Sequence, residues 1–104
     1  MGIIMDSLNN IDNCIINSID RSSVRKKILL YLNDTSKSTM YDIAKDTKIA
    51  YTNVTGGIAG YGKRYDKERS LIHLGLVRME IGIRGLNVYS LTPEGQKLAK
   101  ALGR

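Results

Sequence analysis

The sequence predicts an α+β fold that is mostly α, on the basis of three observations. Apolar residues recur at helical spacing in several segments up to about residue 59. Residues 76–83 (LVRMEIGI) instead alternate between apolar and polar, which is typical of a half-buried strand. Thr92, Pro93 and Glu94 then start a closing helix as cap, first-position proline and first-turn acid. Helices, a hairpin and a last helix, in that order, describe a winged helix-turn-helix.

The N-terminal segment predicts an amphipathic helix whose apolar stripe has two possible uses. The stripe can cap the core or pair with a second copy of the chain, and its spacing fits both. We therefore expect residues 1–19 to form an N-terminal helix with a possible role in dimerisation, and residues 20–104 to form the winged-helix domain. The stripe consists of Ile4, Leu8, Ile11, Ile15 and Ile19.

Residues 21–33 predict a second helix, which Asp20 can cap, and residues 33–37 predict a loop. The helix has an apolar face and a basic face, formed respectively by Val24, Ile28, Tyr31 and Leu32 and by Arg25, Lys26 and Lys27.

The next segment predicts two short helices joined by a tight turn. Thr39 followed by Asp42 resembles a capping box, so a helix of about two turns begins there. Thr47 and Lys48 turn the chain. The following helix starts at Tyr51 or Thr52 and buries Val54 and Ile58, with Tyr61 a further candidate.

The second of these helices runs into a glycine-rich stretch, NVTGGIAGYGKRYDKE (53–68). Gly57 to Arg64 approaches the phosphate-loop pattern, but it lacks the final Ser/Thr and a preceding apolar strand. Glycine costs a helix interior roughly 1 kcal/mol relative to alanine, so we expect the helix to break between Gly60 and Asp66. Residues 66–74 (DKERSLIHL) predict a further helix that Gly75 stops.

The last third of the chain predicts a two-stranded wing and a closing helix. Arg84 and Gly85 form the turn between the strand of residues 76–83 and a return strand over residues 86–91. The closing helix spans residues 93–102. On the first strand we expect Val77, Met79, Ile81 and Ile83 to face inward; on the helix we expect Leu98, Ala101 and Leu102 to be buried.

Charge is distributed unevenly along the 104 residues. Residues 1–20 carry three Asp and no Lys or Arg, so residues 21–104 hold all 16 basic residues against seven acidic ones. This surplus favours a polyanionic partner, nucleic acid first, although a merely solvated basic surface is the alternative.

The composition argues against an enzyme, a metalloprotein and a membrane protein. Cys14 is the only cysteine and His73 the only histidine, so no Cys/His metal site is available and we expect no metal and no cofactor. Neither a Ser-His-Asp nor a Cys-His arrangement can be discerned. No stretch reaches the roughly 18 apolar residues of a membrane span, and the N-terminus does not resemble a signal peptide, so we expect a cytoplasmic protein.

Three stretches also resemble a known family. Ile43 to Val54 (IAKDTKIAYTNV) is similar to the helix-turn-helix core of MarR-like winged-helix regulators. Leu74 to Gly82 (LGLVRMEIG) resembles the entry to their wing, and Tyr89 to Leu102 (YSLTPEGQKLAKAL) resembles the exit into the closing helix. The chain resembles most closely small archaeal winged-helix transcription regulators, over roughly residues 21–102. This resemblance implies DNA binding and regulation of transcription.

The chain departs from this pattern by an insertion at roughly residues 60–70, directly after the expected recognition helix. With Val54 and Ile58 inward, we expect five residues to face DNA: Thr52, Asn53, Thr55, Gly56 and Ala59. Asn53 is the best candidate base reader, because an amide can pair with adenine, although it could simply be solvated. Phosphate contacts are expected from Lys48, Lys63, Arg64, Lys67 and Arg69, and from Arg84 in the wing.

We therefore expect a winged-helix transcription regulator that binds double-stranded DNA as a homodimer. Two alternatives remain open. One is a winged-helix module for protein–protein interaction, compatible with few charges on the recognition helix. The other is a binder of single-stranded nucleic acid or RNA that uses Tyr61 and Tyr65 with the basic insertion.

Overall fold

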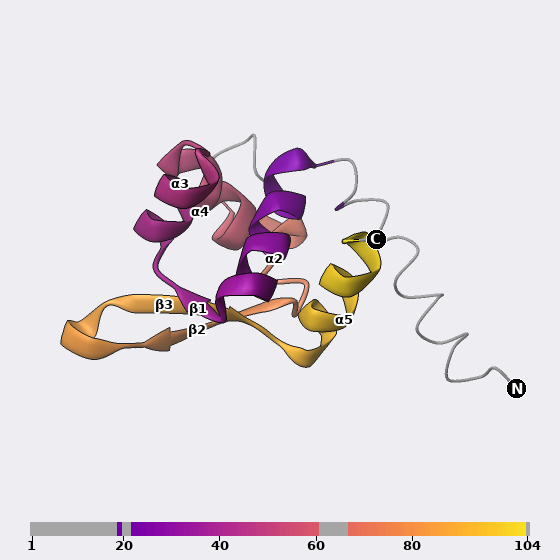
Figure 1. Cartoon of the computed structure of the whole chain (residues 1–104). Helices are drawn as coiled ribbons and strands as arrows, with labels where there is room; N and C mark the ends of the chain where they lie inside the picture. The colour runs from indigo at the N-terminus through magenta and orange to yellow at the C-terminus, as the bar shows by residue number, and fades with distance from the viewer. Residues whose placement is uncertain (1–18, 20–21, 61–66, 104) are drawn as a thin grey trace, which may run out of the picture.

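The structure is a computed structural model, and it describes residues 19, 22–60 and 67–103. Its helices lie over one face of a three-stranded antiparallel sheet with strand order β1-β3-β2 (Figure 1). The β2–β3 hairpin extends beyond the helices at one end, and α5 lies at the other end (Figure 1). In chain order the elements are α2 (Ser23–Thr35), β1 (Lys37–Ser38), α3 (Met40–Thr47), α4 (Tyr51–Ala59), η1 (Lys67–Arg69), β2 (Val77–Ile81), η2 (Ile83–Gly85), β3 (Asn87–Leu91) and α5 (Pro93–Leu102).

This order and layering confirm the predicted α+β fold and are compatible with a winged helix. The helix α2 packs against α4, α5 and the sheet. Fully buried Ile28, Leu29 and Leu32 of α2 join Ile43, Val54 and Ile58 in the core. Ile19, the one described member of the N-terminal stripe, is also fully buried there; the rest of that predicted helix lies outside the described residues.

Two predicted helix starts are confirmed, because local caps define them. The Thr39 side chain accepts a hydrogen bond from the Asp42 amide (3.1 Å), and the Thr92 side chain accepts one from the Gly95 amide (3.0 Å). The start of α2 was predicted wrongly: its cap is Ser22, which accepts from the Arg25 amide (3.3 Å), and the helix continues to Thr35.

Other corrections concern which side chains are buried. Arg25 belongs to the buried side of α2 and not to an exposed basic face, because α2 is covered by α4 on that side. Its Cγ lies 3.6 Å from the position a Cβ would take on Gly57 of α4. In α5 the buried alanine is Ala99, whereas Ala101 is exposed.

The predicted helix over residues 66–74 is wrong. Only the short 3-10 helix η1 forms there, and turns follow it to Gly75. The chain instead hydrogen-bonds to the end of α4, because the Leu71 amide donates to the Gly57 carbonyl (2.9 Å) and the Ile72 amide to the Ile58 carbonyl (3.0 Å). These bonds use backbone donors in tertiary contacts and bring Leu71 fully into the core.

The wing is less buried than its alternating sequence predicts. Val77 is buried, but Met79, Ile81 and Ile83 are 48%, 66% and 85% exposed, so the predicted inward face is wrong beyond Val77. The hairpin itself is regular, with Val77 opposite Leu91 and Ile81 opposite Asn87. Its apolar side chains are exposed because the hairpin runs out past the helices that would cover them (Figure 1).

Candidate nucleic-acid interface

The helix-turn-helix is formed by α3, a tight turn and α4. Lys48 ends α3 in the left-handed conformation (φ 64°), which reverses the chain before α4 begins at Tyr51. The Tyr31 hydroxyl of α2 donates a hydrogen bond to the Asp46 carboxylate of α3 (2.6 Å). This bond holds α3 to α2, whereas α4 packs directly on α2 and is oriented by buried Val54 and Ile58.

The N-terminal end of α4 is open. Tyr51 is 55% exposed, Thr52 is exposed and Asn53 is partly exposed. Ala50, the cap residue, offers no side-chain hydrogen bond to the first backbone amides of the helix. Polar side chains are thus exposed at the N-terminal end of α4, where the helix dipole carries a partial positive charge. Such an end can bind a phosphate or the polar edge of a base.

The other three residues predicted to face DNA are less accessible. Thr55 is partly buried, and its hydroxyl donates to the Tyr51 carbonyl (3.0 Å). Ala59 is partly buried and packs against the core. Gly56 is buried, so the predicted outward orientation of Gly56 is wrong. The neighbouring Gly57 lets α4 pack closely on α2: a Cβ on Gly57 would lie 3.2 Å from Ile28 Cδ1.

The helix α4 ends where its sequence predicted a break. Gly60 follows Ala59 with φ 88° and ψ 140°, a conformation that favours glycine. A Cβ on Gly60 would lie 2.6 Å from the Cα of Lys67, so the chain on the two sides of residues 61–66 is in close contact. The predictions for Lys63 and Arg64, and for Tyr61 and Tyr65, concern residues outside the described ranges.

The described basic candidates are divided between the two ends of α4. Lys48 is exposed beside the N-terminal end, whereas Lys67 and Arg69 are exposed in η1 beside the C-terminal end. A nine-residue helix is roughly 13 Å long, so the two groups are about that far apart. This separation between Lys48 and the pair Lys67 and Arg69 suits contacts at two points of an extended partner better than one binding pocket.

The wing lies next to the open end of α4. Tyr51 of α4 and Met40 and Tyr41 of α3 share a hollow of about 320 Å³ with Gly85 and Leu86 of the wing. Arg84 lies exposed in the wing turn with φ 64°, as its predicted position in the turn requires. The structure therefore brings Tyr51, the first residue of α4, beside the wing turn, while Lys67 and Arg69 lie at the other end of α4.

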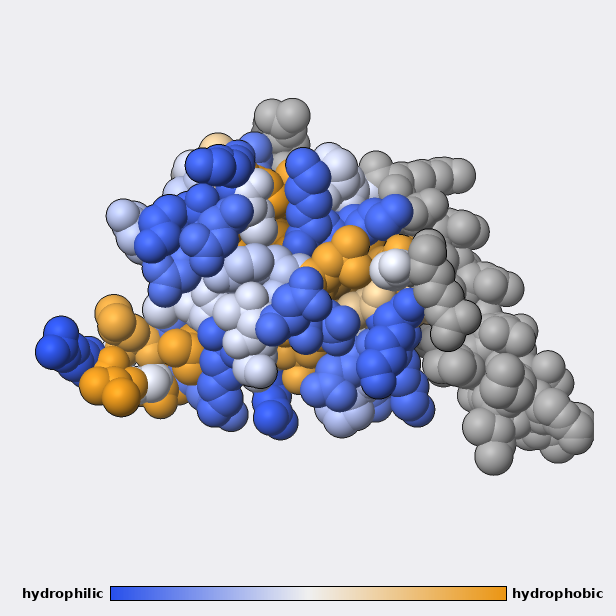
Figure 2. All heavy atoms as spheres, in the orientation of Figure 1, coloured by the Kyte–Doolittle hydropathy of each residue, from blue (hydrophilic) through white to orange (hydrophobic). Residues whose placement is uncertain are grey.

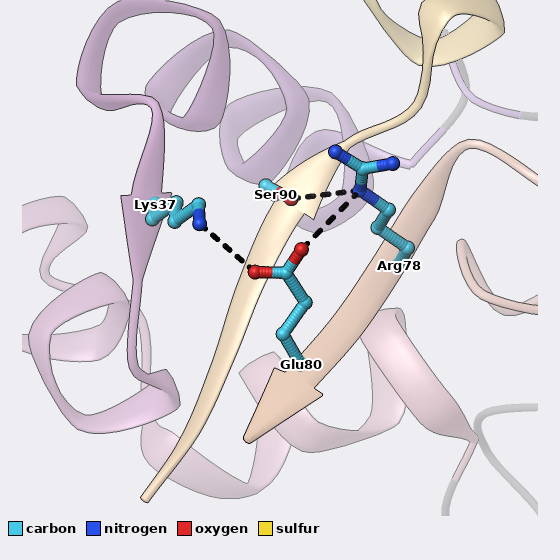
Figure 3. A network of polar contacts seen from close by, with 4 residues as sticks. All are labelled: Lys37, Arg78, Glu80 and Ser90. Atoms are coloured by element: carbon cyan, nitrogen blue, oxygen red, sulfur yellow. Dashed lines mark hydrogen bonds and ion pairs between the residues drawn. The ribbon is translucent and has the colours of Figure 1, made fainter. Parts of the chain in front are cut away.

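A polar network on the sheet was not anticipated from the sequence (Figure 3). Lys37 of β1 reaches across β3 to form an ion pair with Glu80 of β2 (Nζ–Oε1, 2.9 Å). Arg78 Nε lies 3.4 Å from Ser90 Oγ and 4.0 Å from Glu80 Oε2. The Lys37 hydrogen bond, and then the Lys37 charge, hold the pKa of Glu80 below its ordinary value.

The sequence does not indicate this network, because residues 33–37 predict a loop. The two-residue strand β1 carries no local signal, since it exists only through pairing of Lys37 with Ser90 and of Ser38 with Tyr89. The alternation of Arg78 and Glu80 was the one usable signal, and it placed both on the same face of β2 correctly.

Within the described residues, no group of three or more His, Cys, Asp or Glu side chains could hold a metal ion. Over the same part of the chain, no helix is both long and apolar enough to cross a membrane.

The described residues thus define a small α+β protein with a helix-turn-helix and a wing on one side. A model of the EarA-like family matches residues 15–102, and the chain belongs to this family. It is also 38% identical over 99 residues to the uncharacterized protein MJ0905 of the archaeon Methanocaldococcus jannaschii. The match covers 92% of this chain and 87% of that protein.

Proposed function

We propose that this protein is a DNA-binding winged-helix regulator of transcription, and not an enzyme. One observation carries the proposal: the open N-terminal end of α4 and the wing turn share a single hollow. A recognition helix enters the major groove with its N-terminal residues, and a neighbouring hairpin then meets the backbone or the adjacent groove. The basic surplus of residues 21–104 supports a polyanionic partner.

Roles follow from the exposed positions. Asn53 and Thr52 are the base-contacting candidates, with Asn53 able to form a bidentate pair with adenine. Lys48 at the start of α4 and Arg84 in the wing would contact phosphates on either side of that groove. Lys67 and Arg69 would contact the backbone beyond the other end of α4.

The direct test measures binding of the whole protein to random-sequence double-stranded DNA over a range of salt concentrations. If about six phosphates are contacted, affinity falls roughly a thousandfold between 50 and 200 mM salt. Selection from the same random pool identifies a preferred sequence. An absence of binding at low salt would disprove the proposal. Single-stranded probes of the same sequences serve as the comparison, and preference for them would favour the single-strand alternative.

We further propose that the protein acts as a homodimer through residues 1–19. The apolar stripe of this segment fits a short helical seam, and a dimer would place two α4 helices on two half-sites. Analytical ultracentrifugation of the whole chain and of a chain lacking residues 1–18, which keeps the buried Ile19, tests this. A whole chain that sediments as a monomer at all concentrations would contradict it.

A second candidate function, docking of another protein, is favoured by one observation. The nine residues of α4 (YTNVTGGIA) include no charged side chain, which is unusual for a helix that lies against DNA. Under this alternative, Lys48→Ala and Arg84→Ala would bind the protein partner as the wild type does, and salt would have little effect on that binding. The DNA assay separates the two, because only the first function predicts a steep salt dependence of binding to a random pool.

A further inference from the structure

The wing tip presents apolar side chains to solvent in a way that a simple phosphate-contacting wing does not require. Ile83 is 85% exposed, Ile81 66% and Leu86 56%. Figure 2 shows these apolar residues gathered at the projecting end of the hairpin, away from the apolar surface of the main body. Such a cluster usually marks a contact surface, because isolated exposed apolar residues are common but groups of them are not.

The tip is built as a narrow wedge. Arg84 and Gly85 both have positive φ values (64° and 73°), so the chain reverses within the three residues of η2. The Gly82 amide donates to the Leu86 carbonyl (2.6 Å) and closes the loop at its base. A Cβ on Gly85 would meet nothing within 4 Å, so no other part of the protein packs against the turn at this position.

The charge of the tip favours an anionic occupant. Arg84 is the only charged residue from Ile81 to Leu91, and this segment contains no Asp or Glu. A symmetric contact between the wing tips of two copies would bring two Arg84 side chains together, which like-charge repulsion disfavours. DNA offers the opposite combination, a negative groove wall beside apolar base faces.

We infer that Ile83, supported by Leu86, acts as an apolar wedge that enters the minor groove and partly unstacks one base step. This inference rests on the proposed DNA-binding function. Proteins that kink DNA insert Ile, Leu, Met or Phe in this way, and Arg side chains are attracted into a narrow minor groove beside the insertion. The minor groove is about 6 Å wide, which admits a turn but not a helix.

The wedge adds a recognition mode that α4 lacks. The energy needed to unstack a step depends on its sequence and is least at pyrimidine–purine steps such as TA. The wing would therefore select for a deformable step at a fixed distance from the site read by Asn53, without any hydrogen bond to the bases of that step. It would also bend the DNA.

The test uses the whole protein and a duplex selected by the wild-type protein from a random pool. The adenine analogue 2-aminopurine is placed at successive positions, and its fluorescence rises where stacking is lost. Donor and acceptor dyes on the duplex ends report bending. Binding of the wild-type protein is expected to raise the 2-aminopurine fluorescence at one base step and to shorten the distance between the duplex ends.

Three variants complete the design. Ile83→Ala is expected to abolish the local brightening, to reduce the bend and to weaken binding about tenfold. Ile83→Leu is expected to retain all three effects. Ile72→Ala removes an isoleucine outside the wing, 37% exposed, and is the control, expected to bind and bend DNA as the wild type does. A mismatch at the brightened step should restore part of the affinity lost by Ile83→Ala.

The outcomes distinguish the wedge from DNA binding itself. One outcome is that the wild type binds DNA without raising the 2-aminopurine fluorescence at any base step, and that Ile83→Ala binds equally well. Only the wedge is then overturned. If the wild type binds no DNA at low salt, both proposals fail. If Ile83→Ala instead lowers the sedimentation mass and leaves the DNA signals unchanged, the tip is an interface between copies and the wedge is again overturned.

Discussion

Gly95 of α5 lies directly against the backbone of Leu76: a Cβ added to Gly95 would come 2.0 Å from the Leu76 carbonyl oxygen. The same carbonyl accepts a hydrogen bond from the Thr92 amide (3.0 Å), and the Thr92 hydroxyl donates to the Gly75 carbonyl (2.6 Å). The entry to the wing and the start of α5 are therefore joined by backbone contact.

Replacing Gly95 by alanine is expected to destabilise the fold by about 2 kcal/mol or more. Alanine alone would favour the helix by roughly 1 kcal/mol, but the clash with Leu76 forces backbone displacement that outweighs this gain. Chemical denaturation measures the free energy of unfolding. Lys97→Ala, an exposed change in the same helix, is the control and should stay within about 0.5 kcal/mol. A stabilised Gly95→Ala protein would contradict the close approach.

Gly60 is expected to tolerate substitution less well than Gly75. Both have positive φ (88° and 75°), but a Cβ on Gly60 would meet the backbone of Lys67, whereas one on Gly75 would meet nothing within 4 Å. We expect Gly60→Ala to cost about 3 kcal/mol and Gly75→Ala about 1–2 kcal/mol. Unfolding of the two variants side by side tests this order, and equal costs would show that Lys67 does not limit the site.

The ion pair between Lys37 and Glu80 is expected to appear in the titration of Glu80. A carboxylate whose pKa is lowered in the folded state stabilises the fold above its unfolded pKa of roughly 4.3, and the contribution is lost as the pH falls through the folded pKa. Lys37→Ala should therefore raise the pKa of Glu80 toward its ordinary value. Carbon-detected NMR of the carboxyl group measures it. Lys45→Ala, which removes a separate pair with Asp42 (3.8 Å), should leave the Glu80 pKa unchanged.

Lys48 and Asn53 are expected to affect DNA binding in different ways. Lys48→Ala should weaken binding to all sequences and reduce the slope of log affinity against log salt by about 1. Asn53→Ala should leave that slope unchanged and lose roughly 1–3 kcal/mol of discrimination at one base pair. Binding curves for a selected and a scrambled duplex separate the two effects. Lys97→Ala in α5 is the control. An identical loss of DNA affinity in that variant would show that the effect of Lys48→Ala reflects net charge and not its position.

The sequence by itself determined the elements that have local causes. Thr39 and Thr92 start α3 and α5 because their side chains satisfy amides three residues on, and Gly60 ends α4 because its backbone conformation favours glycine. These signals act within one turn of chain. The order of helices, hairpin and final helix could be inferred from them.

Only the tertiary structure decided the features that depend on distant partners. Strand β1 exists because β3 pairs with it, and residues 67–75 avoid a regular helix while Leu71 and Ile72 donate to the end of α4. Gly57 is buried because α4 packs closely on α2. Met79, Ile81 and Ile83 alternate as a buried face does, yet they are exposed because the hairpin runs past the helices. Periodicity specifies which side chains share a face, but only packing decides whether that face is covered.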